Sequence, residues 1–286
     1  LLALAEGNGG TDMDIAIREG LAEARALARQ HWQALLTYVG LGVVLPFLLL
    51  SSEPIFDLRT LVAIAADPWT YRVSGSITGP LYLLGIVSLI VSGALLAAWN
   101  ALLADIREGY ISEIMYGLVA GAAYLAVNMI LYFGVGIILS LPILLLAAFQ
   151  PVQNYGIALV ILRYIVSALL GSWIYARFCL VGPVMAASGR LEPVSAFAES
   201  WRRTREAWPR LLGLYLAIYV VSGLLTLALL APHLFILFNS APGSFAETAM
   251  SVGWLLFWAA YFLMLLLVPA GLYSASEDRT TVEVFA

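Results

Sequence analysis

Long apolar stretches separated by short charged segments dominate this chain. A transmembrane helix needs about 20 mostly apolar residues to cross roughly 30 Å of hydrocarbon. The stretches between neighbouring charges predict six such helices, joined by loops that hold most of the charged residues. The predicted spans are 35–50, 81–103, 114–139, 156–181, 211–230 and 250–272.

The chain from 114 to 162 carries no charge and is too long for one helix. We place a loop near 150–154, where Pro151 lies among polar residues, because proline cannot continue a regular helix. An alternative is a seventh, re-entrant or interfacial segment at 142–149, which begins at Pro142. No Asp or Glu lies in any of the six predicted spans.

The composition supports a membrane location. Of the 286 residues, 62% are hydrophobic and only 11% are charged, with a mean hydropathy of +0.94. A soluble domain carries about 25% charged residues, so lipid must cover most of this surface. We predict an all-α integral membrane protein. The net charge of −4 argues against a nucleic-acid partner, and the use of arginine without lysine is typical of some bacteria.

The arginines predict the orientation of the spans. Loops on the cytoplasmic side of a membrane are enriched in Lys and Arg. The N-terminal segment, the second and fourth connections and the C-terminal tail together hold ten arginines, whereas the opposite side holds only Arg59 and Arg72. We therefore expect a multi-pass protein of the bacterial inner membrane with both termini in the cytoplasm.

A labelling experiment tests this orientation. A cysteine placed at Thr70 or Ser244 should react with an impermeant thiol reagent added outside the cell, because both positions lie in outward connections. A cysteine at Arg190 should not react until the membrane is opened. The reverse pattern would overturn the orientation.

Short motifs indicate an internal repeat. The sequence IREG at 17–20 recurs at 106–109, and the similar FAES occupies 197–200. Each motif precedes an odd-numbered span. In 17–28 and in 197–208, the apolar residues recur at the same helical spacing and form one stripe. The stripe is less complete after the second motif, at 106–109. We expect three units, 13–104, 105–192 and 193–276, each an interfacial helix followed by a helical hairpin. The alternative is convergence among cytoplasmic segments that lead into spans.

The first and third units begin with amphipathic segments at 17–32 and 194–210. We expect these to lie in the headgroup layer, with arginines reaching the phosphates and tryptophans at the interface. Residues 1–12 form a flexible lead-in to a single membrane domain at 13–276, and 277–286 form a cytoplasmic tail.

These segments resemble a known bacterial group. The motifs are PVSAFAESWRRTR at 193–205, WPRLL at 208–212, AIREGL at 16–21 and PAGLY at 269–273. They are similar to six-span membrane proteins related to the membrane domain fused to some glycerophosphodiester phosphodiesterases. The resemblance implies a six-helix membrane module over 13–276. It implies no phosphodiesterase activity, because that chemistry belongs to a separate soluble domain.

Residues for catalysis or metal binding are few. The two histidines, His31 and His233, fall on opposite sides of the predicted membrane, and Cys179 stands alone. Metal sites need clustered ligands, and a hydrolytic triad needs a base beside its nucleophile. We therefore predict no catalytic residue, cofactor or metal.

Arginines and glycines are the remaining candidates. Arg163 and Arg177 lie in the fourth span and either reach the two headgroup layers or contact an anionic lipid. Arg202, Arg203 and Arg205 are further candidate headgroup contacts. Gly117 and Gly121 form a GxxxG step, which lets helices approach closely. This packing contact is expected inside the bundle, with a contact to a partner chain as the alternative.

These observations favour a non-enzymatic membrane scaffold or accessory subunit. Its expected partners are membrane lipids and another integral membrane protein. The alternative is a transporter or channel for a lipid-like or amphipathic solute, with Arg163 contacting its anionic group.

Overall fold

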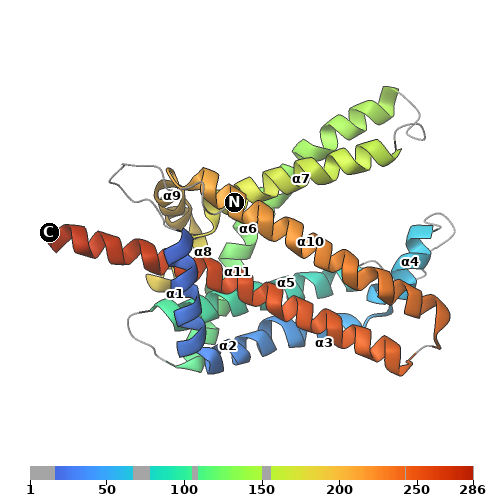
Figure 1. Cartoon of the computed structure of the whole chain (residues 1–286), viewed down its shortest axis with the longest axis horizontal. Helices are drawn as coiled ribbons and strands as arrows, with labels where there is room; N and C mark the ends of the chain where they lie inside the picture. The colour runs from blue at the N-terminus through green and yellow to red at the C-terminus, as the bar shows by residue number, and fades with distance from the viewer. Residues whose placement is uncertain (1–16, 67–77, 105–108, 150–155, 242, 286) are drawn as a thin grey trace.

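Six long apolar helices form the molecule, as a computed structural model shows (Figure 1). The structure describes residues 17–66, 78–104, 109–149, 156–241 and 243–285. Each of the six helices is long and apolar enough to cross a membrane. The chain is therefore an all-α, multi-pass membrane protein, as predicted. The lead-in at 1–12 lies outside the described residues.

The spans are built from nine of the helical segments, and shorter helices connect them. The elements are α1 (Ile17–Gln30), α2 (Trp32–Val39), η2 (Gly40–Val44), α3 (Leu45–Ser51), η3 (Pro54–Phe56), α4 (Leu58–Ala66), α5 (Thr78–Leu103), α6 (Tyr110–Phe149), α7 (Gly156–Phe178), α8 (Val181–Ala187), α9 (Pro193–Arg203), α10 (Trp208–Asn239) and α11 (Phe245–Phe285). The first span is α2–η2–α3, the fourth is α7–α8, and α5, α6, α10 and α11 are the others.

Several helices extend beyond their predicted ends. Helix α6 continues through Pro142 to Phe149, so the predicted end at 139 and the alternative re-entrant segment are wrong. Helix α10 continues through Pro232 to Asn239, beyond the predicted end at 230. Helix α11 continues to Phe285, so the predicted tail is helical. Proline inside a membrane helix is tolerated because neighbouring groups satisfy the carbonyl that it leaves unbonded.

Glycine lets α5 and α6 approach each other closely. A Cβ atom at Gly117 would overlap the carbonyl oxygen of Gly93 and lie 2.8 Å from the Cβ of Ala97. A Cβ at Gly121 would lie 2.8 Å from the Cα of Gly93. The GxxxG step therefore packs inside the bundle, against α5.

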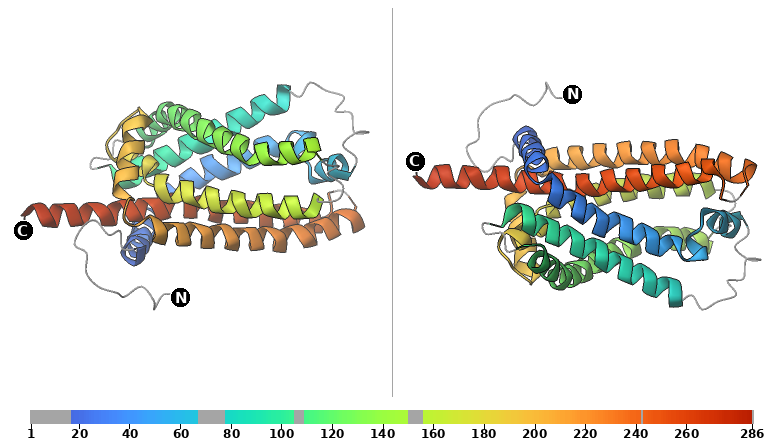
Figure 2. Two further views of the ribbon diagram at one scale, coloured as in Figure 1. Left: turned by 90° about the horizontal axis from the view of Figure 1, so that it is seen from above. Right: turned by 90° about the horizontal axis from the view of Figure 1, so that it is seen from below.

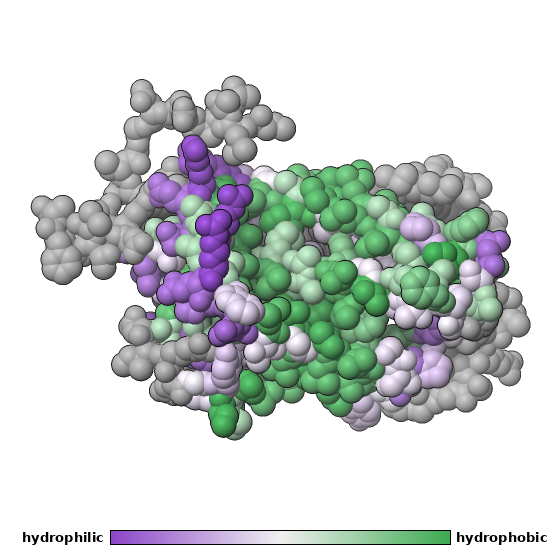
Figure 3. Space-filling model, turned by 60° about the horizontal axis from the view of Figure 1, so that its bottom comes forward, coloured by the Kyte–Doolittle hydropathy of each residue, from purple (hydrophilic) through white to green (hydrophobic). Residues whose placement is uncertain are grey.

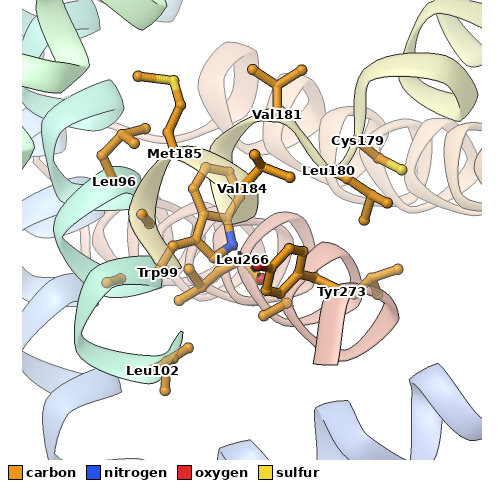
Figure 4. Packing of buried hydrophobic residues seen from close by; sticks show 14 of the residues in the cluster. Leu96, Trp99, Leu102, Cys179, Leu180, Val181, Val184, Met185, Leu266 and Tyr273 are labelled. Atoms are coloured by element: carbon orange, nitrogen blue, oxygen red, sulfur yellow. Dashed lines mark hydrogen bonds between the residues drawn. The ribbon is translucent and has the colours of Figure 1, made fainter. Parts of the chain in front are cut away.

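The core lies where α5, α8 and α11 meet. The indole of Trp99 donates a 2.8 Å hydrogen bond to the carbonyl of Leu266 (Figure 4). Helix α8 packs over this ring, because a Cβ at Gly182 would overlap it. Figure 4 shows Met185 and Val184 of this helix close to the indole. All four side chains are buried or nearly so, and Leu266 and Met185 are completely buried.

The first span contains a π-helical turn. Over Gly40–Val44 the helix widens, and the amide of Leu45 bonds to the carbonyl of Gly40, five residues earlier. Such a turn accommodates one extra residue in an otherwise α-helical segment. Tyr38 before the turn and Pro46 after it are both buried.

Helices α1 and α9 lie across the long helices at one end of the bundle (Figures 1 and 2). Helix α1 crosses α11, where a Cβ at Gly271 would overlap the Gly20 carbonyl and lie 2.6 Å from the Ala24 amide nitrogen. Helix α9 packs on α7 and α8. The predicted segment 194–210 is wrong in its extent, because α9 ends at Arg203 and Trp208 already begins α10.

Both crossing helices use the same register. The buried residues Gly20 and Ala24 of α1 correspond, 180 positions later, to Ser200 of α9 and Thr204, the residue that follows α9. Ser200 and Thr204 are completely buried. Each pair faces the end of another unit's second span. The middle unit has Glu113 at the equivalent position, and it is 1% exposed. This shared register supports the three-unit repeat, which stays a prediction.

Hydrophobic side chains form a broad belt around the middle of the visible face in Figure 3. Hydrophilic side chains gather at the end that carries α1 and, less densely, at the opposite end. This pattern matches a bilayer that surrounds the belt.

Candidate functional site

Arg177 lies at the end of α7 where α9 and α10 also meet. Helix α7 ends at Phe178, and a two-residue turn separates it from α8. The apolar stretch of the fourth span continues beyond Arg177 to Ala187. Arg177 nevertheless lies near the end of a neighbouring span, because it contacts Trp208, the first residue of the fifth span. These contacts place its side chain near one end of the bundle, at the level of the crossing helix α9.

Two tryptophans flank the Arg177 guanidinium. Its Cζ lies 4.2 Å from the ring centre of Trp201 in α9 and 5.5 Å from that of Trp208 in α10. Both distances fall within the roughly 6 Å of a cation–π contact. Trp201 is held in turn by Trp173 and Phe178 of α7, with ring centres 6.0 and 5.8 Å away.

The guanidinium lacks a hydrogen-bond acceptor. Its Nε and Nη1 atoms are buried and have no hydrogen-bond partner in the described part of the chain. No ion pair joins Arg177 to a described carboxylate. Arg205 is instead close enough to repel it electrostatically. A buried donor without an acceptor costs about 1–3 kcal/mol, and more when it is charged. The arrangement is therefore one that an anionic acceptor would stabilise.

Two hydroxyls hold α9 in place over this arginine. Ser200 and Thr204 both donate to the backbone carbonyl of Arg177, at 2.9 and 3.2 Å. The last carbonyls of a helix have no partner within it, and in a membrane they must be satisfied by other groups. These bonds fix the position of α9, and with it Trp201, which lies between the two hydroxyl residues in sequence. We call Arg177, Trp201 and Trp208 the Arg177 cluster.

The other predicted headgroup contacts are dispersed. Arg203 belongs to an acidic network, because it pairs with Glu199 at 2.6 Å and with Glu277 at 3.9 Å and lies over the Tyr273 ring. Arg202 and Arg205 are exposed. The backbone of Arg163 lies in α7, but its side chain is outside the described part. Of the four predicted arginines whose side chains the structure describes, Arg177 is thus the one that lies between two tryptophans, with the positive charge of Arg205 acting on it.

Glu113 is the acidic residue that the sequence analysis missed. We placed it before the third span, yet it lies in α6 within that span, is 1% exposed, and accepts a hydrogen bond from Tyr38. The predicted spans hold no acid, but the observed spans begin earlier or end later and include Glu113, Glu247 and Glu277. A signal existed, because Glu113 lies one and two turns before Gly117 and Gly121 and shares their packed stripe.

His233 and Cys179 lie in surroundings that suit a role in packing. His233 accepts a 2.8 Å hydrogen bond from the Trp254 indole, and Cys179 is a buried free thiol. Among the residues described here, no three His, Cys, Asp or Glu side chains are grouped closely enough to hold a metal ion.

Comparison with known proteins does not extend the assignment. No protein-family model, curated protein sequence or solved structure matches this chain. The site must therefore be interpreted from its own geometry.

Proposed function

We propose that this chain is a non-enzymatic membrane scaffold or accessory subunit that binds an anionic lipid through the Arg177 cluster. The observation that carries the proposal is the partly exposed guanidinium of Arg177 beside two tryptophans, whose Nε and Nη1 atoms have no hydrogen-bond partner among the described residues. A lipid phosphate offers several acceptor oxygens to the planar fork of an arginine. The lipid phosphate would thereby supply the hydrogen-bond acceptor that Arg177 lacks within the described part of the chain.

The depth and composition of the cluster agree with a lipid ligand. Trp201 belongs to a polar crossing helix, whereas Trp208 begins an apolar span. Tryptophan is enriched where hydrocarbon meets headgroups. Arg205 adds a second positive charge near Arg177. The excess of arginine at this end supports a cytoplasmic orientation, where anionic lipids attract basic residues.

The surface of the bundle supports the scaffold role. Exposed apolar side chains cover α10. In the most apolar 18-residue segment of this helix, only 6% of the residues are buried. A membrane helix that is packed so little against its own chain presents a long face to lipid or to another membrane protein.

Lipid retention tests the proposal. We expect Arg177→Gln to lower the anionic phospholipid that co-purifies with the full chain by about 10-fold or more, because a hydrogen bond to a charged group contributes about 1.5–3 kcal/mol. The measurement is mass spectrometry of lipid extracted from protein purified gently out of its membrane. Arg177→Lys should give a partial loss, since lysine lacks the planar fork.

The exposed Arg202 provides the matched control. Arg202→Gln removes the same charge from the same end of the bundle and should leave lipid retention unchanged. Removing the unpaired Arg177 should not lower the thermal midpoint in lipid-free detergent, so a folding defect can be distinguished from lost binding. Equal anionic lipid in Arg177→Gln and in the unchanged protein would refute the headgroup site.

A further inference from the structure

Helix α10 is held to the bundle at its two ends. Its buried residues are Leu211 and Tyr215 near the start and His233 and Leu237 near the finish. At the start, the Tyr215 ring stacks on Tyr175 of α7 at 5.7 Å. At the finish, His233 bonds to Trp254 of α11. No residue between 216 and 232 is buried, so the middle of α10 does not pack tightly on its neighbours.

A groove opens beside this loosely packed middle. It has a volume of about 290 Å³ and lies between α10 and α11. Six residues between Leu214 and Leu225 form one wall, and four between Phe257 and Met264 form the other. Ser222 in the first wall donates its hydroxyl to the carbonyl of Tyr219. Phe257 and Tyr261 stack in the second wall at 6.3 Å. The groove is thus apolar and bordered by ordered rings.

The dimensions of the groove identify its occupant. With a rise of 1.5 Å per residue, the wall from Leu214 to Leu225 is about 17 Å long. A volume of 290 Å³ open to the centre of a water molecule, or 660 Å³ of empty space in all, then gives a mean cross-section of about 17–40 Å². A helix with side chains is about 10–12 Å wide and needs roughly 80–110 Å². Carbon atoms pack about 3.5–4.0 Å apart, so a single hydrocarbon chain needs only about 15–20 Å². The groove therefore has room for one hydrocarbon chain, or two at most, and is too narrow to hold a helix.

We propose that the groove between α10 and α11 binds one acyl chain of a bilayer lipid. Both walls belong to membrane spans, so the surrounding medium at this depth is hydrocarbon. The site is separate from the Arg177 cluster. At about 100° per residue, Leu214 and Val221 lie about 120–140° around α10 from Trp208, so a chain from a lipid at Arg177 does not run straight into the groove.

A photoreactive lipid tests this site in the full-length chain. The probe is a phosphatidylcholine with a diazirine in the middle of one acyl chain, mixed into phosphatidylcholine vesicles. After illumination, mass spectrometry should find label on 214–225 and 257–264 at several times its level on more exposed positions of α6, such as Ile130 and Phe133. Uniform labelling of all exposed apolar faces would overturn the proposal.

Two substitutions sharpen the result. Ala260 lies in the groove wall and is exposed, so Ala260→Trp fills the groove without entering the core and should lower its labelling at least 5-fold. Ala217→Phe in the facing wall is the milder variant if Ala260→Trp lowers the thermal midpoint. Leu224→Trp is the control, because Leu224 is exposed on α10 outside the groove. Equal labelling in all three variants would contradict the site.

The competing occupant and the headgroup site are tested separately. Copies of the chain that carry Ala260→Cys could instead cross-link to one another, or a second copy could displace the lipid label from the groove. Either result would show that protein fills the groove and would overturn the proposal. Arg177→Gln should leave groove labelling unchanged, so the groove and the headgroup site can fail independently.

Discussion

Replacing Gly117 with valine should destabilise the folded bundle by about 3 kcal/mol, at the upper end of the effects of overpacking. The new Cβ would overlap the backbone carbonyl of Gly93 and press on the Cβ of Ala97. Neither group can rotate away, because one is backbone and the other is the first side-chain atom. Helices α5 and α6, which pack closely along this contact, would have to move apart.

A thermal-unfolding midpoint in detergent measures this loss. The matched control is Gly134→Val on the same helix, where a Cβ meets no atom within 4 Å. Both variants add the same β-branched residue to α6, so any difference between them reports the contact with Gly93. Similar midpoints for the two variants would show that the glycine contact does not hold the bundle together.

Replacing Gly271 with valine should release α1 from the bundle. Its Cβ would overlap the Gly20 carbonyl and lie 2.6 Å from the Ala24 nitrogen, so the backbones of α1 and α11 could no longer touch. We expect the six spans to remain, because α1 crosses α11 at one end of the bundle and is not itself a span. A docking contact between backbones cannot be recovered by a change of rotamer.

Limited trypsin digestion of the protein in vesicles measures the release. Cleavage at the α1 arginines 18, 25 and 29 should accelerate by 10-fold or more in Gly271→Val. Gly253→Val on the same helix is the control, because the nearest atom to its Cβ lies at an ordinary 3.8 Å. If α1 stays as resistant as in the unchanged protein, the close approach at Gly271 does not determine its docking.

Features that depend on local spacing were predictable from the sequence. The six spans follow from the length of the apolar stretches, and the Gly117–Gly121 step follows from a four-residue interval. Both arise within one helix, so no knowledge of a neighbour is needed. The helix ends were less predictable, because Pro142 and Pro232 do not interrupt their helices.

The Arg177 cluster could be predicted only in part. The sequence identified Arg177 as a candidate but could not place Trp201 and Trp208 around it, because the three residues belong to three helices. Their meeting depends on the turn at 204–207 and on the two hydroxyl bonds to the Arg177 carbonyl. Glu113 was missed for a related reason. Its burial depends on Tyr38, 75 residues away, whereas hydropathy placed this charge at a boundary.

The π-helical turn at Gly40–Val44 has a consequence for how the first span tolerates changes in length. Elsewhere in an α-helix, adding or deleting one residue rotates everything beyond it by about 100°. Tyr38 and Pro46 are buried on either side of the turn. After such a rotation, the two residues could no longer both face the core. A wide turn already contains the extra residue. Related chains one residue shorter should therefore carry their gap at 40–44, with an unbroken α-helix there.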